Sequence, residues 1–95
     1  MQKQGFVYLI TNKRNGTLYL GVTSNLQQRI WKHKNKIYEG FSCKYDVDML
    51  VWYEVLDDIT EAIKKEKAMK KWDRAWKIKR IENMNPKWDD LYDTL

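Results

Sequence analysis

Tyrosine, glycine and arginine lie close together in the segment LYLGVTSNLQQR, residues 18–29, and a second tyrosine, Tyr8, precedes this segment. The pattern predicts an apolar strand that runs into Gly21, then a polar turn, then a helix that carries Arg29. A guanidinium binds phosphate well, and phenols can position or activate a hydroxyl or a water. Whether these groups act together depends on the elements that position them.

The positive charge of the chain lies in two blocks. Residues 1–44 carry eight Lys or Arg against one acidic residue, and residues 62–88 carry ten against three. Residues 45–61 between them carry six acidic residues and no Lys or Arg. Basic blocks interleaved with aromatic residues favour a polyanion partner, most simply nucleic acid, whereas a solvated helix face is the ordinary alternative.

The chain has 95 residues, 43% hydrophobic and 33% charged, which predicts one globular domain over residues 1–95. Cys43 is the only cysteine, so there is no internal disulfide, and with a single histidine a zinc site of Cys and His ligands is excluded. The apolar run before Thr11 is too short for a signal peptide or a membrane span. We therefore expect a cytoplasmic protein with no membrane partner.

Two apolar runs, FVYLI and LYLGV, flank the segment TNKRNGT and predict a β-hairpin. A two-residue Asn-Gly turn at 15–16 would place Tyr8 opposite Thr23. In that register Tyr8, Tyr19 and Gly21 share one face of the hairpin. The other face would be core, formed by Val7, Leu9, Leu18, Leu20 and Val22.

The motif SNLQ fits a capping box, with Ser24 as the cap and Gln27 reaching back, and predicts a helix to about Ile37. Its apolar stripe consists of Leu26, Ile30 and Ile37. Arg29 and His33 are one turn apart, and His33 falls inside the stripe, so the pair should point toward the sheet. A histidine on an apolar helix face usually has a structural role. Because Arg29 lies on the same inward face, a purely structural role is less expected for His33.

The run MLVWYEVL predicts a central strand covered on both faces, and GFSCKYDVD before it, residues 40–48, predicts a loop. Thr60 would cap a helix that starts at Glu61. The broad apolar stripe of that helix consists of Ala62, Ile63, Met69, Trp72 and Trp76. Glu66 falls in the same stripe, where an unpaired carboxylate is expensive to bury. A salt bridge to a nearby Lys or Arg is one explanation, and a metal or phosphate site is the other.

A break near Asp73 should separate a further helix, which ends at Asn85 because the next residue is Pro86. Asn85 would also cap a short last helix, with Pro86 in its first position. The order is hairpin, helix, strand and helices. It predicts an α+β fold with a small three-stranded sheet, made of the hairpin and the central strand.

These residues resemble the GIY-YIG nuclease domain, which is named after two tripeptides on adjacent strands. Residues 6–8, Phe-Val-Tyr, and residues 19–21, Tyr-Leu-Gly, correspond to the two tripeptides. The further matches are Arg29, His33, Glu66 and Asn85. The resemblance covers nearly the whole chain and is closest to small stand-alone members, related to the incision subunit of nucleotide excision repair and to homing endonucleases. Phe6 replaces the named glycine, and both central residues differ from Ile, at backbone and core positions.

The resemblance implies a metal-dependent endonuclease that hydrolyses DNA phosphodiester bonds, in DNA repair or recombination. Glu66 would hold a divalent metal, Mg²⁺ or Mn²⁺, and Arg29 would hold the transition-state phosphate. Tyr19 would activate water, with His33 as the rival base and Tyr8 orienting the phosphate or the water. The residues expected to contact DNA are Gly21, which would leave room for the substrate backbone, Asn85, Lys32 and Lys70.

Two other function classes fit the same sequence. A nucleic-acid-binding module could keep the nuclease fold with little or no catalytic activity, and would bind DNA without cleaving it. A protein-interaction domain would bind no polyanion even at low salt. A protein partner would also suit a short nuclease that has no additional DNA-binding domain, and the sequence leaves the oligomeric state open.

Overall fold

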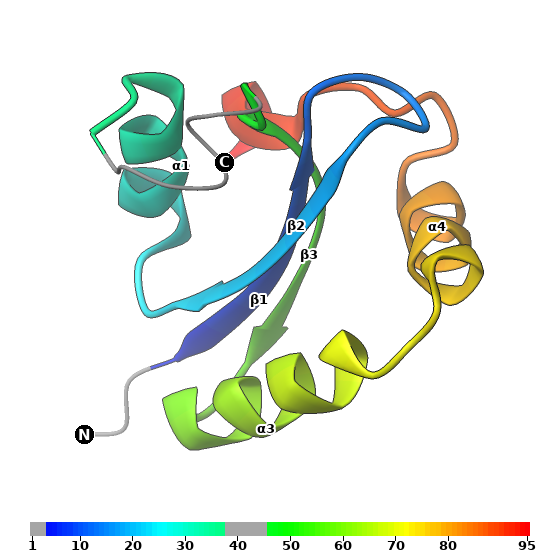
Figure 1. The fold of residues 1–95 in the computed structure, drawn as a ribbon. Helices are drawn as coiled ribbons and strands as arrows, with labels where there is room; N and C mark the ends of the chain where they lie inside the picture. The colour runs from blue at the N-terminus through cyan, green and yellow to red at the C-terminus, as the bar shows by residue number, and fades with distance from the viewer. Residues whose placement is uncertain (1–3, 38–45) are drawn as a thin grey trace.

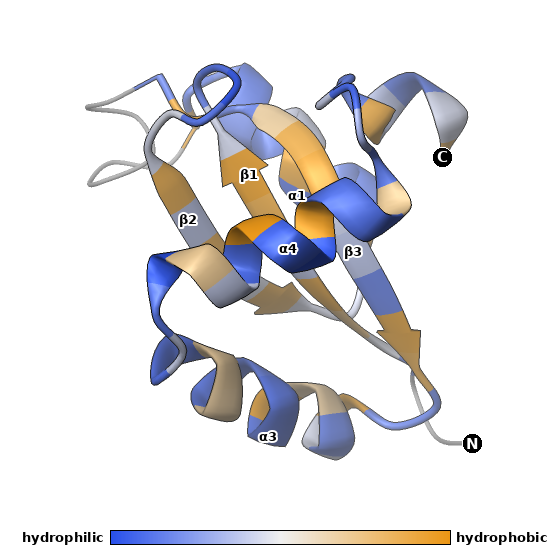
Figure 2. Ribbon diagram, turned by 90° about the vertical axis from the view of Figure 1, so that its right-hand side faces the viewer, coloured by the Kyte–Doolittle hydropathy of each residue, from blue (hydrophilic) through white to orange (hydrophobic). Residues whose placement is uncertain are grey.

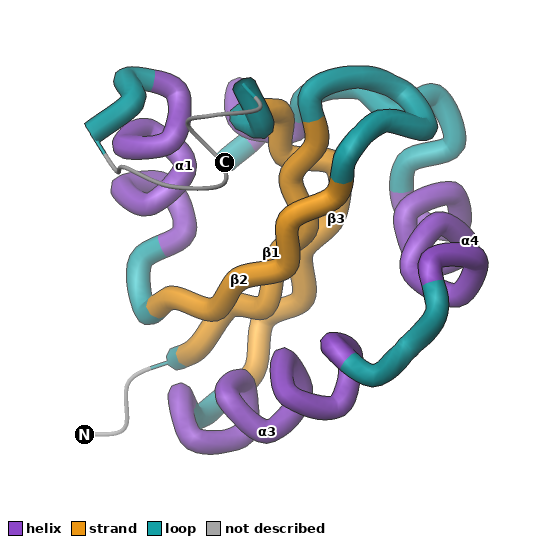
Figure 3. Tube along the Cα trace, viewed as in Figure 1, coloured by secondary structure: helices purple, strands orange, loops and turns teal. Residues whose placement is uncertain are grey.

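The computed structural model describes residues 4–37 and 46–95. It is an α+β structure, as predicted (Figure 1, Figure 3). In chain order its elements are β1 (Gly5–Thr11), β2 (Leu18–Thr23), α1 (Leu26–Lys34), β3 (Met49–Leu56), α3 (Ile59–Lys70), α4 (Arg74–Met84) and the 3₁₀ helix η1 (Leu91–Thr94). Most of the predicted loop at 40–48, with Cys43, lies outside the described residues.

The three strands form an antiparallel sheet in the order β2-β1-β3. The prediction that β3 is central was wrong, because β1 lies between the other two strands. Val7, Tyr8, Leu9 and Ile10 of β1 are completely buried, whereas Val55 of β3 is 46% exposed. A long apolar run therefore did not distinguish the central strand from an edge strand that is mostly covered.

Helices cover both faces of the sheet. In Figure 1, α1 lies on one side of the sheet and α4 on the other, and in Figure 2 α4 crosses in front of the strands with α3 below it. The core accordingly has two parts. One part joins Leu26 and Ile30 of α1 to β1, and the other joins Met69 of α3 and Ile81 of α4 to the opposite face.

The hairpin register differs from the prediction by two residues, since Tyr8 pairs with Gly21 rather than with Thr23. The turn is longer than two residues: the Gly16 amide donates to the Lys13 carbonyl at 2.8 Å, and Asn15 has a φ of 57°. A shift of two residues preserves the alternation of side chains. Tyr8, Tyr19 and Gly21 therefore share one face, as predicted.

The helix starts also differ from the prediction. Asn25, not Ser24, caps α1 by accepting a hydrogen bond from the Gln28 amide, and Asp58, not Thr60, caps α3. The Thr23 hydroxyl accepts from the Asn25 amide, which sets Asn25 in the extended conformation of a cap. At its other end α1 stops at Lys34, which leaves the side chain of Ile37 exposed outside the helix.

The predicted break between the later helices is confirmed, because Asp73 caps α4. Asn85 ends α4, also as predicted, but it does not cap the last helix. That helix, η1, starts only at Leu91, and Asp90 caps it by accepting a hydrogen bond from the Tyr92 amide. Across the described residues, every helix falls short of the length or the apolar character needed to cross a bilayer.

Candidate active site

A tyrosine of the central strand is hydrogen-bonded to the histidine of α1. The Tyr8 hydroxyl oxygen lies 3.1 Å from His33 Nε2, and His33 is only 6% exposed. The prediction that His33 points toward the sheet is therefore confirmed. Tyr8 itself is completely buried in this contact, and its predicted role in orienting the phosphate or the water stays a prediction.

Gly21 makes room for the Tyr8 ring. The two residues are opposite each other in the hairpin, and a Cβ atom at position 21 would lie 2.4 Å from Tyr8 Cζ and from its hydroxyl oxygen. Any side chain at this position would displace the ring. The space over Gly21 that was expected to admit the substrate backbone is thus filled by Tyr8.

His33 is held in its neutral form. Burial, and secondly the positive charge of Arg29, lower the pKa of His33 from 6.5 to about 4. Arg29 is half-buried one turn earlier on α1, so the fold itself places this charge beside the imidazole. At neutral pH the His33 ring has one N–H donor and one acceptor nitrogen, and one of its nitrogens is paired with Tyr8.

Tyr19 packs against the same imidazole from β2. Its ring centroid lies 5.7 Å from that of His33 at an interplanar angle of 61°, and the Tyr8 ring lies at 6.0 Å and 60°. Two tyrosines therefore contact one histidine edge to face. Unlike Tyr8, Tyr19 is partly exposed, so of the two phenols it is the one that solvent and a substrate can reach.

Glu66 lies on the inward face of α3, as the apolar stripe predicted. Its side chain is 9% exposed, and its Oε1 lies 2.7 Å from Nζ of Lys70, one turn later. The hydrogen bond and the charge of Glu66 raise the pKa of Lys70 above its usual value, and the charge of Tyr19 adds to this effect. Lys70 is thus the ion-pair partner of Glu66.

Gly5 is a positioning residue that the sequence reasoning missed. A Cβ atom at position 5 would lie 2.5 Å from the Cβ of Ala62 and 2.9 Å from the Cα of Ile59. Only a glycine lets β1 approach α3 this closely, and Ala62 is one turn before Glu66. The sequence feature that could have identified Gly5 is its position immediately before the first apolar run.

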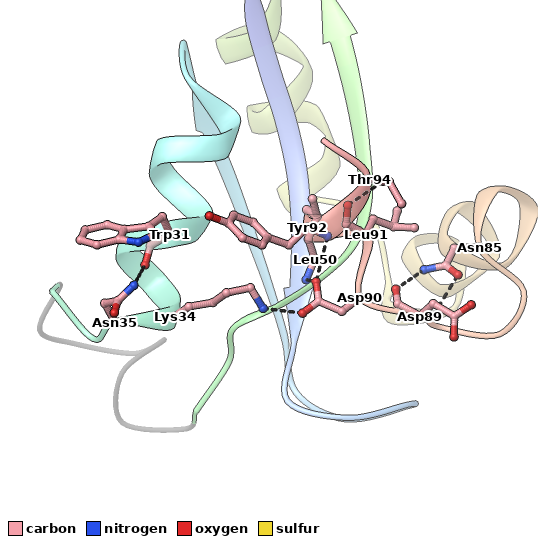
Figure 4. Close-up of polar contacts among 10 residues, drawn as sticks. All are labelled: Trp31, Lys34, Asn35, Leu50, Asn85, Asp89, Asp90, Leu91, Tyr92 and Thr94. Atoms are coloured by element: carbon pink, nitrogen blue, oxygen red, sulfur yellow. Dashed lines mark hydrogen bonds and ion pairs between the residues drawn. The ribbon is translucent and has the colours of Figure 1, made fainter.

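Of the two remaining predicted DNA contacts, Lys32 lies near the cluster and Asn85 does not. Lys32 is half-buried on α1, three residues after Arg29 and so on the same side of the helix. The Asn85 amide nitrogen donates to the Val51 carbonyl. It also donates to the Asp89 carbonyl, and the Asn85 oxygen accepts from the Asp89 amide (Figure 4). These three bonds use the buried carboxamide to fix the end of α4, which is a structural role.

Lys34 and Asp90 tie the C-terminal segment to α1 and β3 (Figure 4). The Lys34 ammonium group pairs with one carboxylate oxygen of Asp90, and the other accepts from the amides of Leu50 and Tyr92. This contact holds α1, and with it Arg29 and His33, in place against the sheet.

The residues of the cluster fit a hard divalent cation better than zinc. The described part of the chain has no group of three His, Cys, Asp or Glu that could ligate a metal, which leaves Glu66 as a lone carboxylate. Mg²⁺ is commonly held by one or two carboxylates together with waters and substrate phosphates. Glu66 is therefore the residue that would hold such an ion, in exchange for its contact with Lys70.

Residues 4–79 match the GIY-YIG catalytic domain, a span that includes every member of the cluster but not Asn85. A UPF0213 protein from Staphylococcus saprophyticus is 34% identical, covering 80% of this chain and 92% of that protein. A UPF0213 protein from Staphylococcus haemolyticus is 33% identical, with coverages of 81% and 93%.

A solved structure has the same fold. The solution NMR structure of a UPF0213 protein from Bacillus halodurans superimposes with a TM-score of 0.56 at 21% identity and covers 92% of each chain. The contacts of Tyr8 and Tyr19 with His33, the buried Glu66 of α3, the fold and the match over residues 4–79 lead to one assignment. The chain belongs to the GIY-YIG family, among relatives that are small UPF0213 proteins.

Proposed function

We propose that this protein is a metal-dependent endonuclease that hydrolyses DNA phosphodiester bonds. The observation that carries the proposal is the position of Tyr19. Its partly exposed phenol packs against the neutral imidazole of His33, and it lies on β2, a strand against which α3 packs with the ion pair of Lys70 and Glu66. A base, a source of positive charge and a carboxylate for a metal are the groups that phosphodiester hydrolysis requires.

Tyr19 is the proposed general base, and His33 is a positioning residue. A group with a pKa of about 4 has little affinity for a proton at neutral pH, so the buried His33 is a poor acceptor. Its contacts with both tyrosine rings suit a role in holding Tyr19 in place. Tyr8 and Gly21 support that role, because the Tyr8 ring packs over Gly21 and its hydroxyl fixes the imidazole.

The cations around Tyr19 are the proposed phosphate contacts. Arg29 is close enough to His33 to lower its pKa, Lys32 follows on the same side of α1, and Lys70 approaches from α3. A guanidinium donates two parallel hydrogen bonds to a phosphate, whereas a lysine acts as a point charge. Arg29 is therefore assigned to the scissile phosphate, and the two lysines to its neighbours.

Glu66 is the proposed metal ligand, and a bound divalent ion would neutralise phosphate charge and assist the leaving oxygen. Burial to 9% exposure keeps the carboxylate oriented by the packing of α3. Lys70 is 62% exposed on a flexible stem, so it can exchange Glu66 for a DNA phosphate at little cost.

A nucleic-acid-binding module without catalytic activity is the second candidate. The observation in its favour is that Lys70 satisfies Glu66 without any metal, so the carboxylate has a structural explanation. This candidate predicts DNA binding that is insensitive to divalent ions, together with a Glu66→Ala variant that binds DNA as the parent does.

A cleavage panel tests the proposal. Purified, folded protein is incubated with plasmid, flapped, branched and single-stranded DNA in the presence of Mg²⁺ or Mn²⁺, and in parallel with EDTA. We expect cleavage of at least one substrate that requires the metal. Binding to these DNAs with no cleavage of any of them would favour the binding module, and neither binding nor cleavage would favour a protein-interaction domain.

A further inference from the structure

A groove of about 370 Å³ is formed by residues of α4 and by Trp72, between α3 and α4. Helix α4 lies on the other side of the sheet from α1 (Figure 1). The groove is lined by Trp72, Trp76, Lys79, Arg80 and Asn83. None of these residues belongs to the cluster around Tyr19. The groove therefore needs an explanation of its own.

The two tryptophans have different surroundings. Trp72 is half-buried and packs against the core, whereas Trp76 on α4 is 59% exposed. Their rings meet edge to face, with centroids 6.0 Å apart and an interplanar angle of 72°. Core packing thus fixes the Trp72 ring at the base of the groove. The Trp76 indole lies on its exposed side and contributes little to folding. An exposed flat ring beside a fixed one is a stacking surface.

Cations surround these rings. The guanidinium carbon of Arg80 lies 5.3 Å from the Trp72 ring centroid, and Nζ of Lys65 lies 5.7 Å from it. Lys79 is, with Arg80, one of two cations in the lining itself. The occupant that complements such a groove has a flat face and carries negative charge, which describes a nucleotide. An apolar peptide would leave the cations without partners.

We infer that this groove binds an unpaired nucleotide of single-stranded DNA, with Trp76 stacking on the base and Lys79 and Arg80 neutralising the adjacent phosphates. The bases of duplex DNA are already stacked on one another and cannot present their faces in this way. The inference deepens the proposed nuclease function and rests on it for the nature of the polymer.

The groove is close to the proposed catalytic residues along the chain. Trp72 follows Lys70 by two residues, so their Cα atoms are at most about 7.6 Å apart. A strand that contacts Lys70 at the end of α3 can therefore continue onto the tryptophans. It follows that the preferred substrate has an unpaired segment beside the cleavage position, as in a flap or a branch.

Binding of a fluorescent oligo(dT), followed by anisotropy, tests the inference in the Glu66→Gln background, where cleavage does not interfere. Trp76→Ala should weaken binding by about tenfold, the scale of one lost stacking contact. Trp76→Phe keeps a ring and should retain most of the affinity. Trp31→Ala is the matched control, because Trp31 is 49% exposed on α1 and should not affect binding.

The salt dependence of binding tests the phosphate contacts. Lys79→Gln should reduce the slope of log K against log salt for oligo(dT) by about 0.7, the value for one contact to a single strand. Lys64→Gln is its control, since Lys64 is exposed on α3 and pairs with Glu61. With a blunt duplex, Trp76→Ala should bind as the parent does.

Parental oligo(dT) affinity in folded Trp76→Ala would overturn the inference, as would an equal loss in Trp31→Ala. An equal loss for oligo(dT) and for the duplex would also contradict it. The outcome is separable from that of the nuclease proposal. Trp76-dependent binding by a protein that cleaves nothing supports the groove alone, and cleavage without any dependence on Trp76 supports the nuclease alone.

Discussion

The Lys70 ammonium nitrogen lies 2.7 Å from Glu66 Oε1, so a cation of the same helix holds the carboxylate that a metal would need. A metal bound there, as proposed, would compete with the lysine for this carboxylate. Lys70→Met should therefore lower the Mg²⁺ concentration that half-saturates metal-induced stabilisation, by roughly threefold for a partly exposed ion pair. Thermal melts in a Mg²⁺ series without DNA measure this. Lys67→Met, an exposed lysine of the same helix, should leave the midpoint unchanged, and an equal shift in both variants would contradict the competition.

The neutral state of His33 predicts acid sensitivity. The pKa of this residue is about 4 in the folded protein and near 6.5 when unfolded, so the unfolded chain takes up the proton first as the pH falls. The free energy of unfolding should decrease as the pH falls below 6.5, by about 3 kcal/mol when pH 4 is passed.

Urea unfolding of the parent and of His33→Gln across this pH range measures the contribution, because the carboxylates common to both proteins cancel in the difference. The parent should lose more stability than the variant between pH 6.5 and pH 4. Parallel curves for the two proteins would show that the folded and unfolded states bind this proton equally well.

Gly21→Ala should destabilise the protein, because the new Cβ would meet Tyr8 Cζ and the hydroxyl oxygen at 2.4 Å. Forcing the ring to move in a packed core costs about 1–3 kcal/mol, which thermal or chemical unfolding detects. The movement should also disturb the hydrogen bond to His33. A melting temperature equal to that of the parent would mean that the Tyr8 ring is not confined over Gly21.

The alternation of side chains along the strands predicted more of the site than the Asn-Gly turn motif did. The register of the hairpin was wrong by two residues, yet Tyr8, Tyr19 and Gly21 kept their common face because side chains alternate with a period of two. The packing of Tyr8 over Gly21 was not predictable, since it depends on the register. The helical period likewise placed His33 and Glu66 inward correctly.

Long-range contacts account for the rest of the differences. The order of the strands, with β1 central, depends on which strands pair across the whole chain. The role of Asn85 depends on the carbonyl of Val51, which lies far away in the sequence. Gly5 is similar, because its importance comes from Ala62 across the α3 interface. Local patterns do not contain these contacts.

The two candidate bases can be separated by one substitution in each. Tyr19→Phe removes the hydroxyl and keeps the ring that packs against His33, so folding should be preserved while the cleavage rate falls by about a hundredfold or more. His33→Gln should keep measurable activity, because the proposed base, Tyr19, remains. Near-parental activity in Tyr19→Phe, combined with no activity in a folded His33→Gln, would reverse the two roles.

The most direct test of the nuclease account compares Glu66→Gln with Glu61→Gln in a Mg²⁺-dependent cleavage assay on the best substrate of the panel. Both glutamates lie on α3, but Glu66 is buried and pairs with Lys70, whereas Glu61 is exposed and pairs with Lys64. The account predicts that Glu66→Gln loses cleavage and metal-induced stabilisation while it still binds DNA, and that Glu61→Gln behaves as the parent. Parental cleavage by Glu66→Gln at the same Mg²⁺ concentration would contradict the account.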